Sequence, residues 1–391
     1  MAPFAGGFRR ELLRLGYRPG VAKHHLVLMG QLNGWLAAEG LSAGELTSPV
    51  ARRFLDDRRA RGQRRVPTLA SLAPLFAYLR DQQVVALEDP EAPSGRDELL
   101  ARFRHHLVFD RGLTRITVLR YERFARRFLT DRASLTGTEI GVEDLTSADV
   151  NAYMLETTAR LAVESAKTRA ADLRALLRFL YVDGILEMDL GGAMPPVAAW
   201  RGTRLPSTMS AADVDALLAS CDRSTTSGRR DRAILVLLAR LGLRSGEVAA
   251  LELGDVDWRA GEILVRGKAR RQDRLPLPVE VGEALVDYLT NGRPTCRWPH
   301  LILTLYAPPR PIHPSSITNV VYRACWRAGL ARVGGHRLRH ALATEMLRQG
   351  GDLIEIAQVL RQSDLATTSG YAKVDRVALR TLAQPWPGAG R

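Results

Sequence analysis

The sequence predicts a mainly α-helical protein with one small antiparallel β-sheet in its C-terminal part. Three observations favour this fold class. Apolar residues recur at helical spacing through most of the chain, two linker-like stretches divide it into three pieces, and short β-type segments gather between residues 254 and 278. We therefore expect two tandem helical units followed by an α+β domain.

The two linker-like stretches set the expected domain boundaries. Residues 87–98 (LEDPEAPSGRDE) are acidic and contain Pro, Ser and Gly, and residues 191–210 are rich in Pro, Gly and Ser. We predict domains over residues 1–90, 94–191 and 205–391.

The first two pieces resemble each other. ELTSPVARRFL (residues 45–55) parallels DLTSADVNAYM (144–154), and LAPLFAYL (72–79) parallels LRALLRFL (173–180). The separation between paired segments drifts gradually, as expected for a duplicated helical unit with small insertions.

One helix of the second piece combines an apolar stripe with basic residues on its other faces. The residues concerned are Leu173, Leu176, Leu177 and Leu180 on the stripe, and Arg169, Arg174 and Arg178 elsewhere. A solvated charged face is one explanation. A similar pattern in residues 114–128 (TRITVLRYERFARRF) favours contact with a DNA backbone.

The third piece mixes helices and strands. Ser210 and Asp213 have capping-box spacing at a helix start, and residues 229–243 form a helix apolar enough to be buried. Residues 254–258, 262–266 and 274–278 read as short strands of one antiparallel sheet, and Pro276 and Pro278 mark its edge.

The charge balance favours a polyanionic partner. The chain has 56 Lys and Arg residues against 42 Asp and Glu, a net charge of +14. Each phosphate that a cation neutralises releases condensed counterions, so nucleic acid is the first candidate. The alternative is a basic surface without a specific partner.

Other features exclude some function classes. No apolar run approaches the roughly 18 residues of a membrane span, and the first 30 residues lack a signal-peptide pattern. We therefore expect a soluble, cytoplasmic protein that is not bound to a membrane. Cys221, Cys296 and Cys325 have neither disulfide-framework nor zinc-site spacing, so we expect no metal site from them.

Lysine is rare among the basic residues. The lysines are Lys23, Lys167, Lys268 and Lys373, and the other basic residues are arginine. Arginine does not readily give up a proton, whereas a lysine ammonium can act as an acid. A lysine that is kept in such an arginine-rich sequence therefore suggests a chemical role that arginine cannot fill.

Four separated segments contain residues suited to chemistry. Arg244 begins a helix with Glu247 three residues on, and Lys268 lies in the turn between two strands. His336 and Arg339 share one face at a helix start, and a tyrosine, Tyr371, lies in a polar turn. Taken singly, each has an ordinary structural explanation, such as an ion pair, a hairpin tip, a cap or packing.

Taken together and in this order, the segments resemble the catalytic domain of the tyrosine recombinase, or phage integrase, family. That family has Arg in an LRxxE helix, Lys in a GK hairpin, HxLR at a helix start, a second His or Trp in LGHxS, and Tyr in a TTxxY turn. The corresponding segments here are residues 243–247 (LRSGE), 267–268 (GK), 336–339 (HRLR), 360–363 (LRQS) and 367–371 (TTSGY). The likeness covers roughly residues 205–383. Residues 94–191 are more weakly similar to the core-DNA-binding domain of the family.

The resemblance implies a site-specific recombinase that acts through a 3′-phosphotyrosine. Tyr371 would attack the phosphate, because a phenolate is also a good leaving group in the return step. Arg244 and Arg339 would hold the non-bridging oxygens, and His336 would donate a hydrogen bond or take the tyrosine proton. Lys268 would protonate the departing 5′-oxygen.

The resemblance also implies the partners of the reaction. It implies double-stranded DNA as the substrate and neither a cofactor nor a metal. It further implies a homo-tetramer, or a hetero-assembly with sister recombinases, on paired sites of a mobile element, in integration or transposition.

One residue departs from the family pattern. Gln362 stands in place of the second His or Trp. Glutamine can donate a hydrogen bond to phosphate but cannot carry a proton. This departure leaves open a DNA-binding accessory subunit with weak or no cleavage. A second alternative, independent of Gln362, is a topoisomerase with the same chemistry but no site preference.

Overall fold

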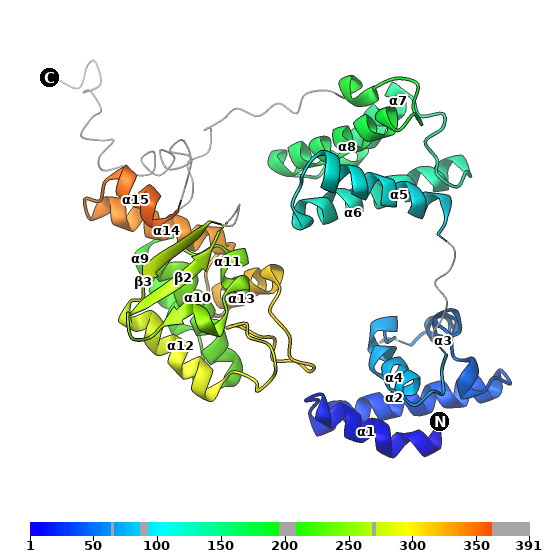
Figure 1. Cartoon of the computed structure of the whole chain (residues 1–391), viewed down its shortest axis with the longest axis horizontal. Coiled ribbons are helices and arrows are strands. Elements are labelled where there is room, and N and C mark those ends of the chain that lie inside the picture. Colours follow the sequence, from blue (N-terminus) through cyan, green and yellow to red (C-terminus); the bar gives the residue numbers. More distant parts are fainter. Residues whose placement is uncertain (64–65, 87–92, 195–208, 268–270, 362–391) are drawn as a thin grey trace. The chain divides into compact units, whose positions relative to one another are not determined.

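The protein is mainly helical with a three-stranded antiparallel sheet, as predicted (Figure 1). The computed structural model describes residues 1–63, 66–86, 93–194, 209–267 and 271–361. Within these ranges, the structure contains no helix that is long and apolar enough to cross a membrane.

The first helical unit is built from α1 (Ala5–Arg14), α2 (Pro19–Ala38), α3 (Ser48–Ala60) and α4 (Leu69–Asp81), with the short 3-10 turns η1 (Ala2–Phe4) and η2 (Ala43–Glu45). Proline stands in the first turn of α2 and of α3, where a missing N–H leaves no helical hydrogen bond unmade. The apolar faces of these helices enclose a core that includes Phe8, Leu32 and Phe54.

The second helical unit contains α5 (Gly95–His105), η3 (His106–Asp110), α6 (Arg115–Thr136), α7 (Ser147–Thr158), α8 (Val163–Val182) and η4 (Leu190–Ala193). The apolar stripe predicted for the last α-helix is confirmed. Its residues are each 0% exposed: Leu173, Leu176, Leu177 and Leu180. Arg174 and Arg178 on the same helix are exposed, so α8 buries one face and presents cations on another.

Two of the paired sequence segments begin helices in the same way. The Thr47 hydroxyl accepts a hydrogen bond from Val50 N at the start of α3, and the Thr146 hydroxyl accepts one from Asp149 N at the start of α7. The shared Leu-Thr-Ser sequence therefore supplies the same N-cap in both units.

The third part contains the sheet and the remaining helices. They are α9 (Ala211–Ala219), α10 (Thr226–Arg240), α11 (Ser245–Ala250), η5 (Leu253–Asp255), α12 (Val279–Asn291), α13 (Pro314–Arg327), α14 (Gly335–Arg348) and α15 (Leu353–Val359). Every residue from Ala233 to Ala239 of α10 is buried, so this helix forms the centre of the core, as its composition predicts. Ser210 caps α9 through the predicted capping box with Asp213.

The sheet has the order β1-β2-β3, with β1 (Val256–Asp257), β2 (Glu262–Arg266) and β3 (Gln272–Pro276). Val256 pairs with Ile263, and Ile263 pairs with Leu275. The bounds of β2 agree with the prediction, whereas β1 is shorter and β3 begins and ends two residues earlier. The reason for the shift is that Pro278 is the N-cap of α12 and not a strand residue. Pro276 ends β3, an edge strand, as predicted.

Separate hydrophobic clusters follow one another along the chain. One draws on residues 8–85, a second on residues 99–194 and a third on residues 209–341. The described residues 93–194 belong to one compact unit. The division into domains over residues 1–90, 94–191 and 205–391 stays a prediction.

Two glycines near the end of α6 provide a matched test of the second unit. Gly141 (φ 77°) and Gly137 (φ 74°) both have left-handed backbone, but a Cβ on Gly141 would lie 2.5 Å from Ala133 N, whereas one on Gly137 meets nothing within 4 Å. Gly141→Ala should therefore destabilise this unit by about 3 kcal/mol and Gly137→Ala by about 1 kcal/mol. Hydrogen exchange of the α6 amides measures both changes. Equal protection losses in the two variants would contradict the backbone clash.

Candidate active site

Arg244 lies directly after the tight turn between α10 and α11. Gly242 in that turn has a φ of 59°, and a Cβ there would lie 2.7 Å from Cδ2 of Leu360. Both the backbone angle and the close approach therefore require glycine. The turn makes Arg244 the N-cap of α11 and leaves its side chain 42% exposed.

Glu247 fixes the orientation of Arg244, as the sequence predicts. Its Oε2 accepts a hydrogen bond from the main-chain N of Arg244 (2.9 Å), and its Oε1 accepts one from Nη1 of Arg244 (2.7 Å). Burial acts to raise the pKa of Glu247, but the hydrogen bonds from Arg244 and the positive charge of Arg361 outweigh it. The pKa of Glu247 is therefore held below its ordinary value, and the carboxylate is charged at neutral pH.

Arg339 on α14 is completely buried. Its Nη1 donates to the main-chain oxygen of Gly242 (2.6 Å), and its Nη2 donates to that of Leu360. The guanidinium thus ties the turn after α10 to the end of α15. Helical periodicity alone predicts a shared face with His336 and gives no sign of this burial.

His336 occupies the first turn of α14. Gly335 beside it packs closely on the preceding helices, since a Cβ there would lie 3.2 Å from Oγ of Ser245. His336 is exposed at the surface, yet partial desolvation, followed by the charges of Arg339 and Arg244, lowers the pKa of its ring. The imidazole is therefore neutral at neutral pH and is able to accept a proton.

His340 lies one helical turn further along α14. Its ring centroid is 5.0 Å from that of His336, in an edge-to-face arrangement. Burial, followed by the positive charge that His336 carries when protonated, lowers the pKa of His340 to about 4. His340 therefore stays neutral and packs against His336.

Arg361 is a residue of this cluster that sequence reasoning missed. It follows α15, and its Nη2 donates to Oε2 of Glu247 at 2.9 Å, with both side chains buried. Its φ is 53°, a left-handed value that favours glycine. A signal was present in the sequence, because Arg361 stands where LGHxS has its glycine.

Three predicted site residues lie outside the described residues: Lys268, Gln362 and Tyr371. The hairpin that carries Lys268 is described up to Gly267, whose N donates to Arg271 O at 2.7 Å. Arg266 at the end of β2 pairs at 2.5 Å with the buried carboxylate of Asp255. This ion pair anchors the strand that leads to Lys268.

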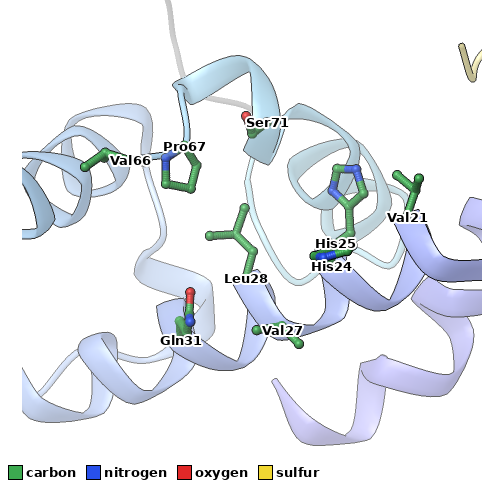
Figure 2. A pocket seen from close by; sticks show the side chains of 9 residues that line it. All are labelled: Val21, His24, His25, Val27, Leu28, Gln31, Val66, Pro67 and Ser71. Carbon is green, nitrogen blue, oxygen red and sulfur yellow. The ribbon is translucent and has the colours of Figure 1, made fainter. Parts of the chain in front are cut away.

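The residues that line a surface pocket of the first helical unit include none of the predicted site residues. It is lined by residues of α2 and of the segment around the start of α4, among them His24, His25 and Leu28 (Figure 2). No Arg or Lys is among its described lining residues. Burial also lowers the pKa of His25, so its ring is neutral at neutral pH.

The described part of the site suits an anion. Arg244, Arg339 and Arg361 bring three guanidinium groups together, and Glu247 neutralises part of that charge. Within the described ranges, no three His, Cys, Asp or Glu side chains gather in a way that could hold a metal ion. Fixed guanidinium groups of this kind stabilise negative charge on phosphoryl oxygens.

Comparison with known proteins agrees with this chemistry. Residues 207–377 match the phage integrase family. A putative integrase/recombinase of Sinorhizobium fredii, y4rA, is 39% identical over 97% of this chain and 93% of its own length. The tyrosine recombinase XerD of Mycobacterium tuberculosis is 31% identical over 74% of this chain and 96% of its own length.

Solved structures share the fold. XerH site-specific recombinase, bound to a palindromic difH substrate in a post-cleavage complex, gives a TM-score of 0.54 at 18% identity and covers 76% of this chain and 98% of its own. A lambda integrase dimer bound to a COC′ core site gives a TM-score of 0.53 at 16% identity and covers 86% of this chain and 87% of its own.

The integrase/recombinase y4rA matches 97% of the chain and XerD matches 74% of it, and the segments that carry the chemistry lie within the matched family region. The chain therefore belongs to the phage integrase, or tyrosine recombinase, family, and it is a site-specific recombinase that cleaves and rejoins DNA strands.

Proposed function

We propose that this recombinase cuts double-stranded DNA by attack of Tyr371 on a phosphodiester, which leaves a 3′-phosphotyrosyl bond and a free 5′-hydroxyl. The observation that carries the proposal is the meeting of three elements at one point. Arg244 and His336 begin α11 and α14, and Arg339 reaches the turn between α10 and α11. The site therefore has its cations fixed before a phosphate arrives, as electrostatic stabilisation requires.

The two arginines of the motif differ in their access to DNA. Arg244 is oriented by Glu247 on one side and is partly exposed, so it is suited to contact a non-bridging phosphate oxygen directly. Arg339 already donates to two main-chain oxygens. In the proposed reaction, one of these bonds gives way to a phosphate oxygen while the other keeps the guanidinium in place.

The proton transfers are divided between His336 and Lys268. His336, neutral because of its lowered pKa, takes the proton of the Tyr371 hydroxyl as the phosphodiester forms. Lys268 gives a proton to the departing 5′-oxygen, a role that arginine cannot fill. Gln362 donates a hydrogen bond to the phosphate and takes no part in proton transfer.

The proposed assembly has several protomers on paired DNA sites, as a homo-tetramer or together with sister recombinases, in the cytoplasm. XerH and lambda integrase, which share this fold, were solved bound to DNA. The exposed arginines of α8 and the net charge of +14 support contact with the DNA backbone.

A nicked suicide duplex that carries the recombination site tests the nucleophile. The parent protein should form a covalent adduct on DNA that resists detergent, and Tyr371→Phe should form none because the attacking oxygen is missing. Denaturing gel electrophoresis measures the adduct. Tyr322→Phe, on α13, is the matched control and should keep the parent yield. A parent protein that shifts DNA mobility without any adduct would favour an accessory subunit.

Substitution of the lysine tests the general acid. Lys268→Arg keeps the charge but should slow cleavage by about 100-fold or more, since a guanidinium does not release a proton. A substrate with a 5′-phosphorothiolate linkage has a leaving group that needs no proton. This substrate should restore the rate of Lys268→Arg in a single-turnover assay, and Lys167→Arg should match the parent on both substrates. Failure of the rescue removes Lys268 from this role.

Removal of the first helical unit tests the predicted domain division. Deletion of residues 1–90 should weaken DNA binding or site choice, because it removes a basic unit with its own core, and should leave Tyr371 able to form the adduct. Mobility shift and adduct yield are measured on the same duplex. Loss of all adduct at saturating protein would assign the unit to the catalytic assembly.

A further inference from the structure

We propose that Arg361 is a positioning residue that holds the Glu247 carboxylate in place, so that Glu247 in turn presents Arg244 to the scissile phosphate. The inference rests on the proposed role of Arg244. It gives a role to Arg361, which lies in the 360–363 segment but has no role in the family pattern.

The two oxygens of Glu247 are shared between the two arginines. Oε1 accepts from Nη1 of Arg244 at 2.7 Å, and Oε2 accepts from Nη2 of Arg361 at 2.9 Å and from the main-chain N of Arg244 at 2.9 Å. The side-chain bond to Oε1 comes from the partly exposed arm of Arg244, whereas the bond from Arg361 comes from a buried side chain on a different element. The Arg361 guanidinium therefore adds a rigid second anchor to the carboxylate.

Exposure separates the roles of the two arginines. The Arg361 side chain is 3% exposed and that of Arg244 is 42% exposed. Arg361 therefore acts on the substrate through Glu247, whereas Arg244 has a free side on which to receive a phosphate.

The backbone at Arg361 supports a specific function for its side chain. A left-handed φ of 53° is unfavourable for arginine and ordinary for glycine. A glycine at position 361 could not form the buried ion pair with Glu247 that Arg361 forms. The neighbouring Leu360 O accepts from Arg339, so residues 360 and 361 together join the end of α15 to α14 and α11.

The test compares Arg361→Met with Arg361→Lys and with the matched control Arg348→Met. Arg348 is an exposed cation at the end of α14, and its substitution by Met removes the same charge from the protein. Adduct formation is followed in single turnover at saturating protein on the nicked suicide duplex. Arg361→Met should slow this step about tenfold or more, because a misplaced catalytic group costs rate even without loss of binding. DNA affinity should match that of Arg348→Met, and Arg361→Lys should recover part of the rate.

A double-mutant cycle distinguishes positioning from a merely structural role. In a Glu247→Gln background the partner of Arg361 has lost its charge, so Arg361→Met should have little further effect on the rate. An equal slowing of adduct formation in both backgrounds would overturn the inference. An Arg361→Met variant that forms the adduct as fast as the parent protein would also overturn it. If Arg361→Met does not fold, Arg361→Gly suits the left-handed backbone and gives the same comparison.

The outcomes also separate this inference from the proposed function. A parent protein without any adduct contradicts both. A parent that forms the adduct through Tyr371, together with an Arg361→Met variant of unchanged rate, contradicts the role of Arg361 alone.

Discussion

The buried carboxylate of Glu247 is the interaction on which the geometry of the site depends. It accepts hydrogen bonds from Arg244, three residues away, and from Arg361, 114 residues away in sequence. A lone buried carboxylate would favour the protonated form, and a lone buried guanidinium would be very costly. Glu247 is paired with both arginines, so the loss of its carboxylate would leave the buried Arg361 guanidinium without its charged partner.

A second constraint is the turn that follows α10. Gly242 allows Leu360 to approach closely, and its main-chain oxygen receives Nη1 of Arg339. The same guanidinium binds the oxygen of Leu360. One guanidinium on α14 thus ties the turn after α10 to the end of α15, which explains how residues distant in sequence keep a common arrangement.

Those parts of the fold and site that depend on local spacing could be predicted from the sequence. The pair of Arg244 and Glu247 lies within one helical turn, and alternation set the bounds of β2. The end of α10 was predicted too late because the left-handed φ of Gly242 stops the helix. The partner of Arg361 could not be read from spacing, since only the tertiary fold brings Glu247 to it.

The burial of Arg339 likewise depends on the tertiary fold and not on local spacing. A helical period assigns residues to faces, and which face is covered depends on elements elsewhere in the chain. The two main-chain oxygens that receive this guanidinium belong to Gly242 and Leu360, which the sequence separates widely. Motif spacing therefore predicts a chemical role for Arg339, but it does not predict the contacts that hold its guanidinium.

The charged residues of the site divide into those that provide fixed positive charge and those that transfer protons. Arginine keeps its proton at any physiological pH, so Arg244, Arg339 and Arg361 provide fixed charge and nothing else. That same fixed charge also acts on His336, because desolvation first, and the charges of Arg339 and Arg244 after it, hold the pKa of the ring below its ordinary value. The cations that would stabilise a phosphate thus also keep a neutral acceptor beside it. In the proposed reaction this leaves the opposite transfer, proton donation to the 5′-oxygen, to a residue whose ammonium can release its proton, and Lys268 is the lysine in the matched motif.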